Sequence, residues 1–440
     1  MKNMSQEVYL IDGVRSAIGN FGGTLAGLRA DDLAAKVIAA LVARHPNLNV
    51  KEIEDVILGC ANQAGEDNRN VARMAGLLAG LPVEVPGETV NRLCASGMAA
   101  AVNAMRALRN GEGNLYIAGG VEHMTRSPWV IAKTTKPFGN DAQMFDSSFG
   151  WRFVNPKMKE LYGIDAMGET AENLVDLFSI SREDQDLFAF RSQQKAFAAQ
   201  QAGYFAAEIV PVTSTDKKGN VSIFDQDEFI KGNSNLEKLA SLKPAFRKTG
   251  GTVTAGNASG INDGAAAMLL ASEAAVKKYG FVPKGRIVSS AVVGVEPRIM
   301  GIGPVNASKK ALEKAGLTLA DIDIFEFNEA FAAQCLAVTR GLGLSDDDAR
   351  INPQGGAIAH QHLRVGTQVL EAKTRRALKR EESAGDFGSL CLPIARGQLH
   401  GLGELGAAGF GPAQEGLKRI EAIGAGGQGE SEKGAEQKIN

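Results

Sequence analysis

The residue of this 440-residue chain best placed to act as a nucleophile is Cys94. A polar turn at 91–92 precedes it, and small residues at 95–97 follow it. An alanine-rich helical pattern then runs to Asn110, which places the cysteine at or just before a helix N-terminus. Free backbone N–H groups at such a position favour a thiolate, and small neighbours leave room for a ligand near the sulfur. A buried structural cysteine is the alternative that the local sequence leaves open.

Polar groups suited to binding or catalysis also occur in the second half. Asn328 stands between a strand pattern and a helical pattern, where α/β proteins present side chains to ligands, although a helix N-cap explains it equally well. The run 252–267 consists of small residues with two asparagines and an aspartate. It fits close packing beside a ligand or a tight glycine bend between sheets.

Two histidines, His360 and His362, follow a glycine turn and are separated by one residue. A metal site is one interpretation, but no carboxylate or cysteine lies close in sequence. With a cysteine nucleophile elsewhere, base catalysis is the favoured interpretation. Cys60 and Cys391 both lie in patterns typical of strand ends, where a small core cysteine is expected.

Composition excludes several classes of protein. A net charge of −2 gives no overall field that would attract nucleic acid or an anionic membrane. Four cysteines without a CxxC pair predict a reducing compartment. No apolar run approaches membrane-spanning length, and the segment 1–7 lacks the apolar core of a signal peptide. We therefore expect a cytoplasmic protein with no nucleic-acid or membrane partner.

Strand and helix patterns alternate along the first part of the chain. They predict strands at 8–11, 55–60 and 115–118, the last ending at a glycine pair. They also predict helices at about 31–44, capped by Asp31, at about 71–79, and from about Cys94 to Asn110.

The order of patterns repeats later in the chain. The apolar positions of 317–327 match those of 48–58 in spacing, and in both an amphipathic helix, an acidic turn and a strand follow one another. Between the repeats the chain is more polar, with an amphipathic run at 182–199. We predict an α/β protein with two similar halves and an insertion. The predicted units are 1–122 completed by 252–276, the insertion 123–251, a second half at 277–413, and a disordered tail at 414–440.

Five motifs in order resemble the thiolase family: 90–97, 254–267, 301–304, 328–331 and 355–359. The resemblance covers roughly residues 8 to 360 and implies duplicated α/β halves in a layered α-β-α-β-α arrangement with an inserted loop domain.

Two further motifs, 150–156 and 167–173, are most similar to the family members that act on 3-oxoadipyl-CoA. Acetoacetyl-CoA thiolases usually carry a histidine where this chain has Ala166.

The resemblance implies a role for each catalytic candidate. Cys94 would attack the ketone of a 3-oxoacyl-CoA, and the acyl group would then pass to a second CoA. His362 would activate Cys94 and donate to one oxyanion, and Asn328 would hold a water for that oxyanion. Cys391 would protonate the departing acetyl-CoA enolate. Such chemistry needs a thiolate, a proton donor and charge stabilisation at two oxygens.

The resemblance also implies binding residues and partners. CoA serves as a co-substrate, with no tightly bound cofactor and no metal, and the protein is expected to form a homodimer or homotetramer. Lys243, Arg247 and Lys248 could neighbour the CoA phosphates, or form a solvated basic loop. The expected lining of the pantetheine channel is Met167, Phe246, Ala255, Ser259 and Phe331.

The chain departs from the family pattern after Ala359. The family continues with Gly-His-Pro, where this chain reads His360-Gln361-His362-Leu363, and it has a glycine two residues after the second cysteine, where this chain has Pro393. That glycine donates an N–H to the second oxyanion hole, and proline has none to donate. Losing one such donor costs on the order of a hundredfold in rate.

Three functions therefore compete. The first is cleavage of 3-oxoadipyl-CoA, the second is an acetoacetyl-CoA or broad-specificity thiolase, and the third is a CoA-thioester-binding homologue with impaired turnover. The free carboxylate of a dicarboxylic substrate requires a cation, for which Arg126, Arg152 and Lys157 are the candidates.

Overall fold

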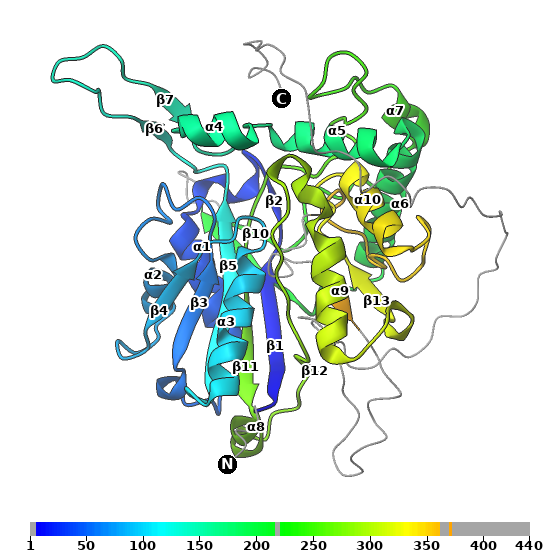
Figure 1. Cartoon of the computed structure of the whole chain (residues 1–440). Helices are drawn as coiled ribbons and strands as arrows, with labels where there is room; N and C mark the ends of the chain where they lie inside the picture. Colours follow the sequence, from blue (N-terminus) through cyan, green and yellow to red (C-terminus); the bar gives the residue numbers. More distant parts are fainter. Residues whose placement is uncertain (1–5, 216–220, 361–368, 372–440) are drawn as a thin grey trace.

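The computed structural model describes residues 6–215, 221–360 and 369–371 (Figure 1). Its largest sheet has the strand order β12-β1-β11-β5-β3-β4, with β2 paired to β11 and β8 paired to β1. The strands β3, β4 and β5 are mutually parallel, whereas β11 is antiparallel to both β1 and β5. The members are β1 (Val8–Ser16), β2 (Gly19–Asn20), β3 (Asp55–Gly59), β4 (Gly87–Val90), β5 (Leu115–His123), β8 (Ile209–Val210), β11 (Asn262–Ser272) and β12 (Gly285–Arg286).

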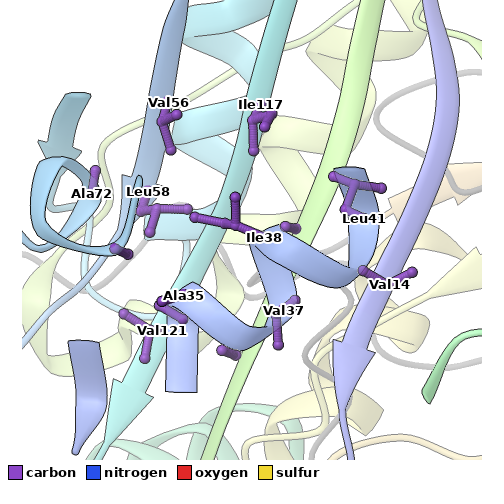
Figure 2. Packing of buried hydrophobic residues seen from close by; sticks show 14 of the residues in the cluster. Val14, Ala35, Val37, Ile38, Leu41, Val56, Leu58, Ala72, Ile117 and Val121 are labelled. Carbon is purple, nitrogen blue, oxygen red and sulfur yellow. The ribbon is translucent and has the colours of Figure 1, made fainter. Parts of the chain in front are cut away.

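Helices cover both faces of this sheet, and the alternation of apolar residues along each strand explains why. On one face, α1 (Ala30–Ala43) and α2 (Val71–Leu78) bury Val56, Leu58 and Ile117 (Figure 2). The intervening residues point to the other face, where Ile57 and Tyr116 pack with α3 (Ser96–Asn110). Burying each large aliphatic side chain contributes about 1.5–3 kcal/mol, so a strand that is apolar on both faces must lie between two layers.

The small-residue run predicted to bend or to contact a ligand is in part a central strand. β11 is buried along its whole length and pairs on both sides. Its small side chains fit there because neighbouring strands approach closely: a Cβ added at Gly119 would lie 2.1 Å from the carbonyl oxygen of Ala266. For the same reason β5 does not end at Gly119 and Gly120, as the sequence suggested, but continues to His123.

The second half repeats the pattern of the first. β13 (Ile324–Glu326) pairs with β14 (Val369–Glu371), and Phe325 forms a parallel bridge with Ile351, as Val56 does with Gly87 in β4. The residues that the repeat equates, Ile53 with Ile322 and Val56 with Phe325, are all buried. Helices α8 (Glu273–Tyr279), α9 (Gly303–Ala315) and α10 (Ala332–Leu342) follow β11. α8 packs against β1 and β11, whereas α9 and α10 pack with β13 in the core of the second half.

The insertion lies across one end of the molecule (Figure 1). Its helices α5 and α6 pack with α10 in the core of the second half, and the β6–β7 hairpin projects to the side. A buried bidentate ion pair, Arg15 to Asp227 at 2.7 and 2.9 Å, ties the insertion back to β1. Its elements are β6 (Trp129–Ile131), β7 (Met144–Asp146), α4 (Pro156–Tyr162), α5 (Met167–Phe178), α6 (Arg182–Gln201), β9 (Val212–Thr215), β10 (Val221–Phe224) and α7 (Leu236–Ala240).

The predicted fold class and the predicted cap of the first helix have different outcomes. The α/β class, with a sheet flanked by helices, is confirmed. The predicted cap of the first helix is wrong, because Arg29 is the N-cap residue and Asp31 lies within the first turn. The limits of the predicted units stay a prediction, and the predicted tail 414–440 lies outside the described residues. No helix in the described ranges is long and apolar enough to cross a membrane.

Candidate active site

Cys94 lies in a tight turn between β4 and α3. The helix begins at Ser96, with Ala95 as its N-cap residue. Leu93 takes a left-handed conformation with φ 49°, which reverses the chain just before the cysteine. The N–H of Ala95 donates to the carbonyl of Arg92 at 3.0 Å, and the N–H of Ser96 donates to Leu93 at 2.9 Å. The turn leaves Cys94 exposed, so the interpretation as a buried structural cysteine is wrong.

Side chains on both sides fix this turn. The Ser96 hydroxyl accepts from the N–H of Arg92 at 2.8 Å and donates to the carbonyl of Leu93 at 2.6 Å. The Asn91 side chain accepts from the N–H of Leu93 and donates to the carbonyl of Ala61 at 3.0 Å. These bonds satisfy backbone groups that a left-handed turn leaves open.

The start of α3 is pressed against the end of β3. A Cβ added at Gly59 would lie 2.3 Å from the backbone nitrogen of Gly97 and 2.3 Å from the carbonyl carbon of Ser96. Only glycine allows two backbones to approach this closely. The position of Cys94 therefore depends on Gly59, a residue distant in sequence.

Glu122, near the end of β5, is a site residue that the sequence analysis missed. Its carboxylate accepts from the N–H of Ala61 at 2.9 Å and from the N–H of Asn62 at 3.1 Å. Burial raises its pKa. The signal that could have found it is a glutamate shortly after the two glycines at the end of a predicted strand.

The pKa of the Cys94 thiol is raised, contrary to the expectation from a helix start. Surrounding protein desolvates the sulfur, although one side is open to solvent, and the nearby carboxylate of Glu122 adds to the shift. The thiol therefore needs a base to become a nucleophile.

Cys60, Asp67 and Glu122 bring three possible ligand atoms within 4.8 Å of one another. The Cys60 sulfur donates to Asp67 at 3.6 Å, and burial raises the pKa of this thiol. Since Glu122 already accepts two backbone N–H groups, these atoms are engaged in hydrogen bonds that fix the end of β3.

A second turn carries Asn328. It follows β13, and α10 begins only at Ala332, with Phe331 as N-cap residue, so the interpretation of Asn328 as a helix cap is wrong. Glu329 takes a left-handed conformation with φ 46°. Within the described residues no hydrogen bond engages the Asn328 amide, which is half-buried and free to hold a water.

The side chain of Glu329 holds this turn in place through hydrogen bonds. It is buried and accepts from Ser192 at 2.6 Å, from Asn352 at 2.6 Å and from the N–H of Ile358 at 3.3 Å. Burial raises its pKa. One carboxyl group thus joins the Asn328 turn to α6 and to the segment that leads toward His360.

Three of the predicted pantetheine residues lie together beside this turn. Ser259 donates its N–H to the carbonyl of Ala330 at 3.0 Å, and Ala258 bridges to Phe331. The Phe246 ring meets the Phe331 ring edge-on, with centroids 5.9 Å apart. These contacts form an aromatic wall next to Asn328.

The remaining predicted binding residues lie near this wall. Met167 begins α5 and is exposed, and Gly168 after it leaves the space that the Phe246 ring fills. Ala255 is exposed on the turn before Ser259. The binding roles stay predictions.

Arg247 is already paired. Its guanidinium donates to Glu169 at 3.0 Å and to Asp176 at 2.8 Å. The neighbouring Lys243 and Lys248 are exposed. A phosphate at this loop would compete with α5 carboxylates for Arg247, whereas the lysines are open to it.

Of the two histidines, the structure describes only His360. Its Nε2 lies 3.0 Å from the carbonyl of Gln354, its Nδ1 lies 3.7 Å from Asp227, and its ring packs on Phe205. Burial lowers its pKa to about 4, so it is neutral at physiological pH. His362 and Cys391 lie outside the described residues.

The geometry defines a sheet-and-helix protein with a cysteine turn at the carboxyl ends of parallel strands. The family model for "Thiolase, N-terminal domain" matches residues 8–274, and that for "Thiolase, C-terminal domain" matches residues 281–402. The chain belongs to the thiolase family, which confirms the predicted family, fold and acyltransferase class.

Relatives and solved structures agree. The chain is 54% identical over 396 residues to the beta-ketoadipyl-CoA thiolase of Pseudomonas knackmussii, covering 90% of this chain and 98% of the relative. It is 52% identical to the 3-oxoadipyl-CoA/3-oxo-5,6-dehydrosuberyl-CoA thiolase of Escherichia coli K12, covering 89% and 98%.

Among structures, the acetyl-CoA acetyltransferase of Bacillus anthracis superimposes with a TM-score of 0.76 at 41% identity, over 83% of this chain and 90% of that one. Human mitochondrial 3-ketoacyl-CoA thiolase gives a TM-score of 0.74 at 39% identity, over 82% and 88%.

Proposed function

We propose that this protein cleaves 3-oxoadipyl-CoA with free CoA to give acetyl-CoA and succinyl-CoA. The observation that carries the proposal is the open Cys94 turn in a chain 52–54% identical to enzymes named for this substrate. Atom balance gives the second product, because breaking the bond between C2 and C3 of the six-carbon acyl chain leaves a four-carbon dicarboxylic acyl group.

The proposed reaction begins at the Cys94 thiol. A base removes the proton of the Cys94 thiol, whose pKa is raised, and the thiolate attacks the ketone carbon. The C2–C3 bond breaks, its electron pair leaves with acetyl-CoA as an enolate, and a proton donor quenches it. A second CoA thiol then attacks the acyl-enzyme and releases Cys94.

Other groups would support these steps. We assign the base to His362 and the proton donor to Cys391, both as predictions from the resemblance. Asn328, whose amide has no hydrogen-bond partner among the described residues, would hold a water on the oxyanion formed from the ketone. CoA would enter as a substrate along the wall of Phe246, Ser259 and Phe331.

Three coarser expectations accompany this proposal. We infer a homodimer or homotetramer, a cytoplasmic location, and activity without a tightly bound cofactor or metal. The family membership supports these inferences.

A thiolysis assay with 3-oxoadipyl-CoA and CoA tests the proposal. Wild-type turnover that falls by about a thousandfold or more in Cys94→Ala supports it, because a missing nucleophile removes the covalent route. Cys335→Ala is the matched control, since Cys335 is buried within α10. Full activity in Cys94→Ala would contradict the proposal.

Turnover of two substrates and mass spectrometry of Cys94 distinguish the alternative functions. If acetoacetyl-CoA turns over and 3-oxoadipyl-CoA does not, the protein is a thiolase of different specificity. An acylated Cys94 without release by CoA identifies the impaired homologue, the outcome expected if Pro393 removes a needed donor.

A further inference from the structure

The three cations that could bind the free carboxylate of the substrate differ in their contacts within the structure. Arg126 donates through Nε to Glu66 at 2.7 Å, through Nη2 to the same carboxylate, and through Nη1 to the carbonyl of Ala26 at 3.1 Å. Its charge is thus already matched by a carboxylate. Lys157 lies in the first turn of α4 and is exposed.

Arg152 lies on the segment between β7 and α4, and this segment is anchored over the end of β5. Ser147 donates its hydroxyl and its N–H to the carbonyl of Pro128, at 2.6 and 3.1 Å. The Ser148 hydroxyl donates to the carbonyl of Met124 at 3.0 Å. Because residues 124–128 follow β5 directly, these bonds bring Arg152 to the strand end that carries Glu122.

The guanidinium then connects to the Cys94 turn through residues 61–62. Nη2 of Arg152 donates to the side-chain oxygen of Asn62 at 3.2 Å. On the other side, Asn91 donates to the carbonyl of Ala61 at 3.0 Å, three residues before Cys94. A single dipeptide therefore supports both the nucleophile turn and the arginine.

The pKa shifts of Glu122 and Cys94 also reflect the short distances between these groups. The charge of Arg152 lowers the pKa of Glu122, against the larger effect of burial, and Glu122 raises the pKa of Cys94. Thiol, carboxyl and guanidinium are thus close enough to influence one another.

The donors of Arg152 are mostly unused. Besides Asn62, its guanidinium reaches only a carbonyl, that of Ser147 at 3.3 Å, and among the described residues no carboxylate forms a salt bridge with it. A guanidinium has five N–H donors in a fork that matches a carboxylate. Two long bonds to neutral acceptors leave this fork available for an anion.

We propose that Arg152 binds the free carboxylate of a dicarboxylic 3-oxoacyl-CoA and so determines its selection over monocarboxylic substrates. This inference rests on the proposed function. In the acyl-enzyme, two methylene groups separate the thioester carbon from the carboxyl carbon, a span of about 4 Å. A cation that binds this carboxylate must therefore lie within one side-chain length of Cys94, and Arg152 is the candidate whose contacts place it there.

Binding measurements test the assignment independently of turnover. Succinyl-CoA and butyryl-CoA carry acyl chains of equal length that differ in the terminal carboxylate. In a Cys94→Ala background, Arg152→Gln should weaken succinyl-CoA binding by about ten- to a hundredfold, the usual size of a lost charge-assisted pair. Butyryl-CoA binding should change less than about threefold, and Arg152→Lys should be intermediate for succinyl-CoA because it keeps the charge and loses the fork.

Control variants make the result specific. Lys157→Gln removes an exposed cation nearby and should leave the preference for succinyl-CoA unchanged. Equal weakening of both ligands by Arg152→Gln, or a selective loss in Lys157→Gln, would overturn the assignment. If Arg152→Gln does not fold, the ratio of the two affinities in Arg152→Lys decides the question.

Kinetics with the intact nucleophile separate this inference from the proposed function. Wild-type thiolysis of 3-oxoadipyl-CoA reports on the function, whereas the ratio of kcat/KM for 3-oxoadipyl-CoA and acetoacetyl-CoA in Arg152→Gln reports on the arginine. A parallel fall for both substrates, with a shifted pH profile, would show that Arg152 acts through Glu122 on Cys94 and would reject carboxylate binding.

Discussion

Each half of the molecule contributes one strand-to-helix turn with a non-glycine residue in the left-handed conformation, Leu93 with φ 49° in the first half and Glu329 with φ 46° in the second. Leu93 is 68% exposed, and its turn rests on backbone packed against Gly59. Glu329 is buried, and its own carboxyl group makes the bonds that hold its turn.

The difference follows from what each turn presents. The first turn leaves a thiol open, so the sulfur can meet a substrate while its backbone is fixed from behind by steric contact. The second turn leaves an amide available, and a polar network beneath it fixes the backbone. Backbone packing is disturbed by an added methyl group, and a polar network is disturbed by a changed charge, so the two turns should respond to different substitutions.

Gly59→Ala should give the largest effect. The new methyl group would overlap backbone atoms of α3 at 2.3 Å, and backbone cannot rotate away as a side chain can. Overpacking typically costs 1–3 kcal/mol, and a shift of about 1 Å at a nucleophile can cost about a hundredfold in rate. Thermal unfolding and thiolysis rate measure both effects.

Gly27→Ala is the control for this substitution, because nothing lies within 4 Å of the added methyl group. Wild-type stability and rate in Gly59→Ala would show that α3 can move without consequence.

Glu329→Gln should have a smaller effect that depends on pH. Because burial raises the pKa of Glu329, the folded protein binds this proton more tightly than the unfolded chain. Wild-type stability should therefore decrease as pH rises from the ordinary glutamate pKa of about 4.5 toward the folded value, whereas the glutamine variant lacks this contribution. The stability difference between them should shrink over that range.

Urea unfolding at several pH values between about 5 and 8 measures this prediction. Glu313→Gln, which changes an exposed carboxylate on α9, serves as the matched variant. A stability difference that widens with rising pH would contradict the expected sign.

Leu93 substitutions should give the smallest effect. A β-branched residue is the least tolerant of positive φ, so Leu93→Val should lower stability by about 1 kcal/mol. Leu93→Gly should be more stable than Leu93→Val and close to wild type, because strain relief offsets the added freedom of the unfolded chain. Thermal unfolding of the two variants, measured side by side, tests this prediction. Equal stabilities would argue against strain at Leu93.

Sequence patterns were sufficient to predict the internal repeat and most helices and strands of the first half. Apolar residues at periods of two and 3.6 reflect burial directly, which is why β3, α2 and α3 fall where they were expected. β11 was missed as a strand because its first six residues, Asn-Asp-Gly-Ala-Ala-Ala, carry no such period. Its position depends on the close approach of β1 and β5, which no local pattern contains.

The site was predictable to the extent that it is local. The Cys94 turn was located from its own residues, but its electrostatics depend on Glu122 from another strand, and the expected thiolate was therefore wrong. The Asn328 turn was located, while its cap interpretation failed because the helix starts four residues later. The roles of His362 and Cys391 stay predictions.

The position of β11 in the sheet has a consequence for protein synthesis. β5 leaves the ribosome long before β11, which follows only after the insertion, from His123 to Asn262. At about 5–20 residues per second, that interval lasts on the order of ten seconds. During this time β1 and β5 have no partner between them, so the nascent chain exposes two apolar strand edges that a chaperone or premature self-association can occupy before the centre of the sheet exists.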